Sequence, residues 1–395
     1  MIKVLGYGDN VFDDYFQQKV MYPGGNALNF SVYTHELGAN SAYLGNIAYD
    51  ELGAYIISVC KQMNIDISKC NLVSNHSTQI CRILLNGNAY DDSQEKYDEH
   101  YEQFYNELKR YDNLFDIYKH YDGITNLYDV NKSAAVSPVK VDSEITELLK
   151  FGKKAYELTD GKTNICFGSV LKLWHDEREW ATENPDDAKL PDDGALKEAS
   201  KHTNIDDLII DEENSTVYFK DKDLQLDVGA IAKGYAVSKV AQWAQENLWS
   251  SAAISIGGNV ATFGYKNNDG STLWKIGIEN PDKTAEDYLM TVNITGLSVV
   301  TSGNYQRYYT VNNKQYCHII NPDTLMPAEF MTSVSVICED SALGDALSTG
   351  LFNMSIEDGK NLVDSMDGVE AVWVDNNYNK TYSNGFEKYI NKNQE

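Results

Sequence analysis

The sequence predicts an α+β protein with a mainly antiparallel sheet flanked by helices, preceded by a small α/β segment. Two observations predict this fold class. From about residue 208 onward, short runs that alternate apolar and polar residues follow one another, which is typical of half-buried antiparallel strands. The first 70 or so residues instead alternate single strands with helical patterns, as small α/β units do.

The N-terminal segment is expected to contain strands at 2–7 and 41–45 and helices at 27–37 and 50–63, with a Gly turn at 22–26. Residues 71–80 are polar and rich in turn formers, so a boundary is expected here. The sequence therefore predicts two domains, 1–72 and 77–390.

The middle of the chain predicts a helix over 93–111 and a second over 143–158, which opens with Ser143 as N-cap. The acidic, Pro-containing stretch 176–193 favours a surface loop. Beyond it, helices are expected at 233–247 and 341–353. Strands are expected at 207–210, 216–220, 224–228, 252–256, 274–279, 290–295, 298–301, 308–311, 316–320 and 333–338.

Charge and cysteine content restrict the function. A formal net charge of −26 disfavours nucleic acid as a partner, because the phosphate backbone would be repelled. A dinucleotide would need local neutralisation of its phosphates, for which a carboxylate-bound divalent metal is one means. The six cysteines form no C-x-x-C pair, and no stretch of about 18 apolar residues occurs. We therefore expect a cytoplasmic protein without a membrane span.

A glycine-containing junction at 227–234 is the first candidate for chemistry. Gly229 allows a tight turn, and the helix that follows directs free N–H groups and its positive dipole end toward the junction. Lys233 adds a mobile cation, so the segment suits a diphosphate. Such a junction, taken alone, is more often structural.

Two further candidates lie near the C-terminus. Asp345 and Thr349 are four residues apart on one helix face, and their oxygens suit a hard cation such as Mg²⁺. An isolated pair of this kind is more often a structural Asp and Thr. His318, at a predicted strand end, is a candidate general base, although most such histidines only form surface hydrogen bonds.

Five motifs occur in an order that resembles one family. They are D-x-G-A-x-A-K-G at 227–234, I-G-G-N at 256–259, T-S-G-x-Y-x-R-Y at 301–308, H-I-I-x-P-x-T at 318–324 and D-A-L-S-T at 345–349. From about residue 77 onward the chain resembles the FAD:protein FMN transferases, the flavin transferases of the ApbE family. The resemblance implies Mg²⁺-dependent transfer of FMN from FAD to a Ser or Thr hydroxyl with release of AMP. It also implies an acceptor flavoprotein of the electron-transfer type with a Ser/Thr flavinylation motif.

The resemblance also implies roles for individual residues. The Ala230 carbonyl, Asp345 and Thr349 would hold Mg²⁺, with Ser348 adjacent, while His318 would act as base and Lys233 would assist. The residues expected to contact FAD are Tyr118, Lys162, Thr163, Asn164, Asp227, Lys233, Gly257, Gly258, Asn259, Ser302, Gly303 and Ile319.

The N-terminal segment resembles a different family. Residues 6–13 and the motif at 22–29 are similar to the start of ribokinase-type (PfkB) sugar kinases, most nearly the fructoselysine 6-kinases. The resemblance implies a truncated, catalytically dead fragment, since the related catalytic motif is incomplete at 340–345. Two alternatives stay open. One is a sugar kinase that uses Gly24, Gly25 and Asn29 for substrate and Asp345 as base, which is disfavoured because the ATP-binding half is missing. The other is a non-catalytic flavin-binding protein.

Overall fold

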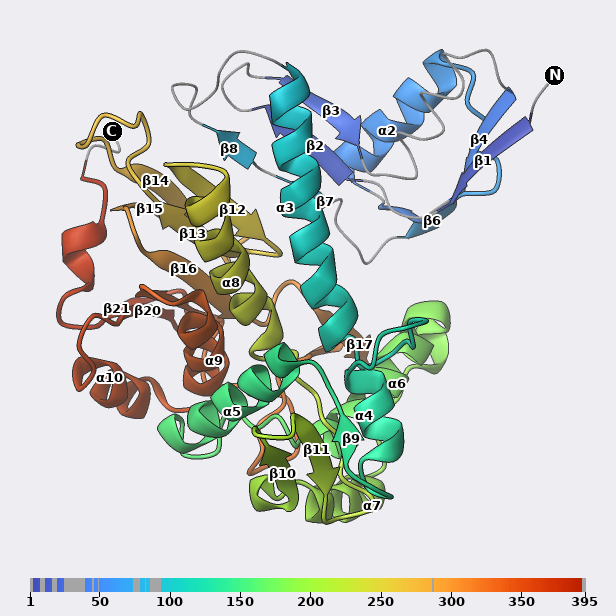
Figure 1. Ribbon diagram of the computed structural model, residues 1–395, viewed down its shortest axis with the longest axis vertical. Helices are drawn as coiled ribbons and strands as arrows, with labels where there is room; N and C mark the ends of the chain where they lie inside the picture. The colour runs from blue at the N-terminus through green and yellow to red at the C-terminus, as the bar shows by residue number, and fades with distance from the viewer. Residues whose placement is uncertain are drawn as a thin grey trace. The chain divides into compact units, whose positions relative to one another are not determined.

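The structure, a computed structural model, describes residues 3–7, 11–15, 20–24, 40–44, 46–48, 50–73, 79–81, 83–85, 94–285 and 288–392. The chain divides into two compact units, Met1–Leu85 and Asn86–Glu395 (Figure 1). Each is described by itself. The domain boundary expected between residues 72 and 77 stays a prediction.

The first unit has short strands around one described helix, α2 (Glu51–Gln62). Helix α2 begins at the N-cap Asp50, whose side chain accepts from the Gly53 N–H at 2.6 Å. The strands are β1 (Lys3–Tyr7), β2 (Val11–Tyr15), β3 (Val20–Gly24), β4 (Asn40–Leu44), β5 (Asn46–Ala48), β6 (Asn71–Val73), β7 (Gln79–Cys81) and β8 (Ile83–Leu85). The pairs β1–β4, β2–β7 and β5–β6 are parallel, as an α/β segment requires. The predicted helix 27–37 and the sugar-motif positions Gly25 and Asn29 lie outside the described residues.

The second unit contains most of the helices. They are α3 (Gln94–Phe115), α4 (Leu127–Ser133), α5 (Ser143–Leu158), α6 (Gly168–Glu183), α7 (Asp193–Ala199), α8 (Ala232–Asn247), α9 (Ser341–Phe352) and α10 (Ile356–Asp364). Short 3₁₀ turns are η2 (Pro185–Asp187), η3 (Ser200–His202), η4 (Ile205–Asp207) and η5 (Phe386–Tyr389). None of the described helices has the length and apolarity needed to cross a membrane.

The central sheet of this unit is antiparallel throughout, in the order β21-β20-β19-β16-β13-β12. Helices α8 and α9 lie side by side across one face of it (Figure 1). Its strands are β12 (Ala252–Ile256), β13 (Asn259–Phe263), β16 (Ser298–Gly303), β19 (Ser333–Cys338), β20 (Glu370–Val374) and β21 (Lys380–Tyr382). This arrangement confirms the predicted α+β class.

Smaller antiparallel sheets surround the central one. They are built from β9 (Val139–Lys140), β10 (Leu208–Asp211) and β11 (Thr216–Phe219), from β14 (Trp274–Glu279) and β15 (Tyr288–Ile294), and from β17 (Tyr308–Val311) and β18 (Lys314–Cys317). Every residue of β19 is buried, and this strand packs with α9 and α10 into one core. A second core joins α6 and α7 to β17.

Three local predictions were wrong, each for an identifiable reason. The first half of the expected loop 176–193 belongs to α6, because Val170, Trp174 and Ala181 recur at helical spacing and are buried. The N-cap of α5 is Asp142, whose carboxylate accepts from the Glu144 N–H at 2.9 Å, and not Ser143. The expected strand 224–228 is not a regular strand, for reasons given below.

Candidate active site

The turn that leads into α8 is built from tertiary hydrogen bonds. In the expected strand 224–228 only Gln225 forms a bridge, with Phe167. The Asp227 N–H donates to the Ile165 carbonyl at 2.9 Å, and the Leu226 backbone is bonded by the Asn131 amide at 2.7 and 3.0 Å. The backbone of the segment therefore forms its hydrogen bonds without pairing along a neighbouring β-strand. Its apolar residues are nevertheless buried, as the alternating pattern predicts.

Helices α8 and α9 touch at Gly234. Its N–H donates to the Asp345 carboxylate, with 2.7 Å between N and Oδ2. A Cβ at this position would lie 2.3 Å from the Ser341 carbonyl oxygen and 2.5 Å from the Asp345 Cβ, so only glycine fits. Gly234 is the third residue of α8, so its N–H has no acceptor within the helix and bonds to the buried carboxylate instead.

The expected metal ligands differ in their present contacts. Asp345 is 5% exposed, and the Lys233 ammonium lies 3.7 Å from its Oδ1. The fully buried Ser348 hydroxyl is occupied, since it lies 2.9 Å from the Ser302 hydroxyl and donates to the Asp345 carbonyl at 3.1 Å. Thr349 is half-buried and follows Asp345 by one helical turn.

The ring of His318 is held by the carbonyl of Arg307. Both the His318 backbone N–H and the ring Nδ1 lie 3.1 Å from this oxygen. A carbonyl oxygen can only accept, so Nδ1 carries the hydrogen and Nε2 is left as the free acceptor. Burial lowers the pKa of His318 to about 3, and the positive charges of Arg307, Arg178 and Lys233 lower it further. The imidazole is thus neutral at physiological pH.

Tyr118 and Asp227 share their surroundings with these cations. The Tyr118 ring is 63% exposed and stacks on His175, with 5.1 Å between ring centres. Partial burial raises the pKa of Tyr118 to about 12, and the charge of Asp227 adds to the shift. Burial also raises the pKa of Asp227, against the opposing effects of the Gly229 N–H at 2.8 Å and of His175. Tyr118, Asp227 and His318 therefore lie within one electrostatic neighbourhood.

The expected flavin-pocket segment 162–164 lies against α9. The buried Thr163 hydroxyl donates to the Ala346 carbonyl at 2.8 Å, and the Asn164 side chain donates to the Thr203 carbonyl at 2.9 Å. Lys162 forms an ion pair with Asp323. These side chains are engaged with protein groups, and Ile319 is buried in the core shared by α9 and β19.

The hairpin between β12 and β13 approaches Lys233. Gly257 and Gly258 have φ values of +55° and +89°, which favour glycine, and a Cβ on Gly257 would lie 3.1 Å from the Lys233 Cδ. Asn259 follows at the start of β13 and is fully buried. Its amide nitrogen and oxygen have no hydrogen-bond partner among the residues that the structure describes. Orphaned buried amide atoms of this kind indicate a missing ligand or water. At the end of β16, Gly303 leaves space for the ring of Tyr305.

Sequence reasoning missed three residues of the site, His175, Arg178 and Arg307. Arg178 donates to the His175 Nδ1 at 2.8 Å, directly behind the Tyr118 ring. The helical spacing of Trp174 and Arg178 could have indicated the position, but the acidic composition of 176–193 favoured a loop.

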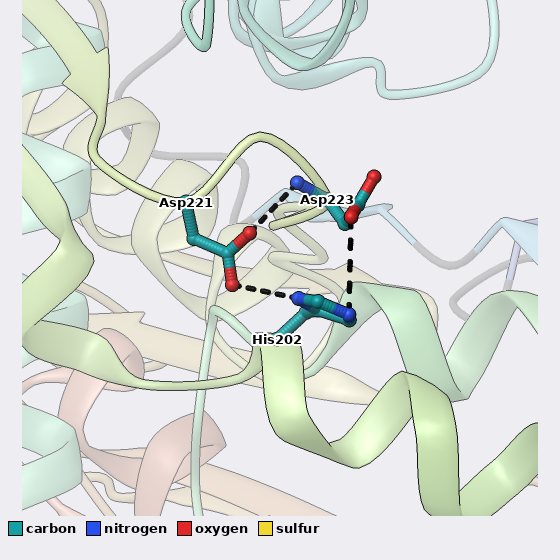
Figure 2. Close-up of side chains that lie close together, drawn as sticks. All are labelled: His202, Asp221 and Asp223. Atoms are coloured by element: carbon teal, nitrogen blue, oxygen red, sulfur yellow. Dashed lines mark hydrogen bonds and ion pairs between the residues drawn. The ribbon is translucent and has the colours of Figure 1, made fainter.

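A second polar cluster lies outside this site (Figure 2). His202 Nδ1 lies 2.7 Å from Asp221 Oδ2, and its Nε2 lies 3.9 Å from Asp223 Oδ2. Within the described ranges it is the only group of three His, Cys, Asp or Glu side chains close enough to share an ion. Lys222 pairs with Asp223 at 2.9 Å, so the acceptors are already used within the protein. The cluster ties η3 to the segment that leads to Asp227.

Comparisons with known proteins identify the family of the chain. The model of the ApbE family matches residues 80–373. The chain belongs to the ApbE family. Its similarity to named relatives covers the same region. The FAD:protein FMN transferase of Klebsiella pneumoniae is 30% identical over 271 residues, which are 68% of this chain and 80% of the relative. The one of Treponema pallidum is 32% identical over 257 residues, 62% and 69% of the two chains.

Solved structures of ApbE proteins share the fold. The crystal structure of the Thermotoga maritima ApbE protein is 29% identical, with a TM-score of 0.67, and the match covers 76% of this chain and 94% of that one. The Vibrio cholerae flavin transferase ApbE is 22% identical with a TM-score of 0.62, covering 77% and 93%. The model of the pfkB family of carbohydrate kinases matches residues 5–116, less than half of this ApbE-family chain.

Proposed function

We propose that the chain transfers FMN from FAD to a Ser or Thr hydroxyl of an acceptor protein and releases AMP. Family membership and the names of the relatives support this activity. The observation that carries the proposal is the contact between Gly234 and Asp345, because it joins the turn of Ala230 and Lys233 to a buried carboxylate. A dinucleotide's paired phosphates need such a combination of cation, carbonyl and carboxylate.

The donor set fits Mg²⁺. This ion prefers oxygen ligands, uses one or two carboxylates and keeps positions for water and substrate phosphate. The Ala230 carbonyl, the Asp345 carboxylate and the Thr349 hydroxyl would hold it. Ser348 would position Asp345 and β16 rather than bind the ion, because its hydroxyl is already occupied. When bound, Mg²⁺ would offset the charge of the diphosphate.

The transfer step needs positioning and a base. The acceptor oxygen attacks the flavin-side phosphorus, the bond from this phosphorus to the bridging oxygen breaks, and AMP leaves with the electron pair. His318 Nε2 accepts the hydroxyl proton, for which its neutral state and free acceptor position are suited. Lys233 stabilises negative charge on the leaving phosphate.

The flavin is expected to bind between Tyr118 and the segment 162–164. The exposed Tyr118 ring offers a stacking surface for a flat heterocycle. The orphaned amide of Asn259 and the N–H groups of the Gly257–Gly258 hairpin provide polar groups for the phosphate end. Ile319 would contribute an apolar wall.

The acceptor is expected to be an electron-transfer flavoprotein in the cytoplasm. Its surroundings would then be reducing, so its cysteines would stay reduced. Among the residues that the structure describes, Cys60, Cys166, Cys317 and Cys338 form no disulfide. Cell fractionation with an antibody against the chain tests the location.

One assay tests the activity. The protein is incubated with FAD, Mg²⁺ and an acceptor that carries a short Ser/Thr flavinylation motif, and the acceptor band is examined for in-gel flavin fluorescence and the solution for AMP. Asp345→Asn should abolish both signals, while Asp367→Asn, at an exposed turn, should leave them unchanged. Full transfer by Asp345→Asn would contradict the metal assignment. ATP consumption with fructoselysine in the absence of FAD would favour the kinase alternative.

A further inference from the structure

Arginine is scarce in this chain and concentrated at the candidate site. The sequence contains four arginines among 33 basic residues. Arg178 lies on α6 and Arg307 lies directly before β17. Both act on the same imidazole, since their charges contribute to the lowered pKa of His318.

The fold fixes where these two side chains begin. Helix α6 and strand β17 share one core, in which the Trp174 and Tyr309 rings lie 6.3 Å apart. The Trp174 Nε1 also donates to the Leu325 carbonyl at 3.0 Å. Arg178 follows Trp174 by one helical turn, and Arg307 precedes Tyr309 by two residues. The shared core therefore anchors both arginines next to the loop that carries His318.

Local contacts then orient the two arginines. Arg178 Nη2 lies 2.8 Å from His175 Nδ1, and the His175 ring stacks on Tyr118. Arg307 holds the backbone and ring of His318 through its carbonyl, so its guanidinium is left for other contacts.

Among the residues that the structure describes, neither guanidinium forms an ion pair with a carboxylate. Over the described part of the chain, neither Arg178 nor Arg307 has a carboxylate within 4.0 Å. Arg110, by contrast, lies 3.1 Å from Glu107 and 3.8 Å from Asp142. In a chain with 59 acidic residues and a net charge of −26, two adjacent arginines without an acidic partner are unexpected. A planar guanidinium matches two oxygens of a phosphate or carboxylate, so an anionic ligand is the natural partner.

We propose that Arg178 and Arg307 together bind the flavin-side phosphate of FAD, the group that is transferred. The inference rests on the proposed function. The acceptor hydroxyl attacks this phosphorus while His318 removes its proton, so groups that surround His318 adjoin the same phosphate. In the transition state, negative charge is spread over the non-bridging oxygens, where two guanidinium groups stabilise it.

The arrangement also couples binding to proton transfer. Without ligand, burial keeps the pKa of His318 low, and the charges of Arg307, Arg178 and Lys233 lower it further. A bound phosphate offsets their charge, so the pKa of His318 rises when the substrate is in place. The base is thereby strengthened only in the complex that needs it.

Binding of FMN and riboflavin to the full chain tests the proposal, because the two flavins differ only in the phosphate. The wild type should bind FMN more tightly than riboflavin. Arg178→Gln and Arg307→Gln should each weaken FMN binding by about tenfold, the loss of one charge-assisted contact, and leave riboflavin binding unchanged. The lysine variants should recover part of the loss. Arg110→Gln, which removes the same charge at an ion-paired arginine, should leave both affinities unchanged.

Unchanged FMN affinity in both glutamine variants, or an equal loss for both flavins, overturns the proposal. So does a rise in the acceptor KM with an unaltered FMN preference, because the arginines would then bind a carboxylate of the acceptor. In transfer assays at saturating FAD, each variant should lower kcat about 100-fold. If the wild type flavinylates no acceptor but its phosphate preference depends on the arginines, the proposed function fails and the phosphate site stands. If transfer is normal and the preference does not depend on them, only this inference fails.

Discussion

The replacement Gly234→Ala should separate α8 from α9 and disable the site. The new methyl carbon would lie 2.3 Å from the Ser341 carbonyl oxygen and 2.5 Å from the Asp345 Cβ. Ordinary contact begins at 3.4 Å, so the helices must move apart by about 1 Å, and packed interiors resist such shifts. The hydrogen bond of 2.7 Å between the Gly234 N–H and the carboxylate is the first contact that this movement breaks.

The magnitude follows from three contributions. Overpacking costs about 1–3 kcal/mol, and the loss of a hydrogen bond to a charged group costs about 1.5–3 kcal/mol. The better helix propensity of alanine returns about 1 kcal/mol. The free energy of unfolding should therefore fall by about 1.5–5 kcal/mol, and FMN transfer should be lost even where the protein stays folded.

Urea denaturation at constant m-value measures the first effect, and in-gel flavin fluorescence measures the second. The control is Gly194→Ala in α7, where the added carbon would meet only the Asp192 carboxylate at 3.0 Å. That variant should keep both its stability and its transfer activity. If Gly234→Ala behaves like the control, the close helix contact does not position Asp345 and the reasoning is wrong.

Three further predictions concern single side chains. His318→Gln should lower transfer about 10²- to 10⁴-fold with FAD binding retained. Because the pKa of His318 in the free wild type is lowered to about 3, kcat/KM, which reports the free enzyme, should show no acid limb near pH 6.5. A limb there would contradict the assignment. Between pH 3 and about 6.5 this histidine is protonated in the unfolded chain but neutral in the folded protein. The free energy of unfolding should therefore fall as the pH drops from about 6.5 toward 3. Asn259→Leu removes a side-chain amide that has no hydrogen-bond partner among the described residues. The melting temperature should therefore stay the same or rise, while the affinity for FAD falls about tenfold. A large loss of stability would instead indicate a structural role for Asn259. His202→Ala should cost about 1–2 kcal/mol at pH 7, because its bond to Asp221 is lost. Burial opposes the shift, but the Asp223 N–H and His202 lower the pKa of Asp221. The stabilisation that Asp221 contributes to the folded protein is therefore fully present above its ordinary pKa of 3.8. It is lost as the pH falls through the lowered pKa of Asp221 in the folded state. If the wild type and His202→Ala have the same melting temperature at pH 7, the bond between His202 and Asp221 does not stabilise the protein.

The sequence predicted the long periodic elements well. Helices α5, α8 and α9 and the buried strand β19 lie within a residue or two of the expected ranges, because a sustained apolar period leaves one compatible structure. Short segments were harder. In 224–228 the alternation predicted burial correctly, but the backbone bonds go to Ile165 and the Asn131 side chain, which no local pattern reveals.

The candidate site shows the same division. The motifs identified Lys233, Asp345 and His318 as candidates, but their spacing could not show that Gly234 and Asp345, 111 residues apart, are hydrogen-bonded. Arg178 was hidden because the acidic residues around it have the composition of a loop, although they belong to α6. That Ser348 faces Ser302 rather than an ion depends on how α9 packs on β16, which is a tertiary property.

The hydrogen bond between Gly234 of α8 and Asp345 of α9 has a consequence for biosynthesis. During translation, Gly234 leaves the ribosome more than a hundred residues before Asp345 does. A nascent polypeptide that already carries Gly234, the Gly257–Gly258 turn and His318 would still lack the carboxylate. Loading with the dinucleotide should consequently be among the last events of maturation, and chains halted before residue 345 should emerge empty.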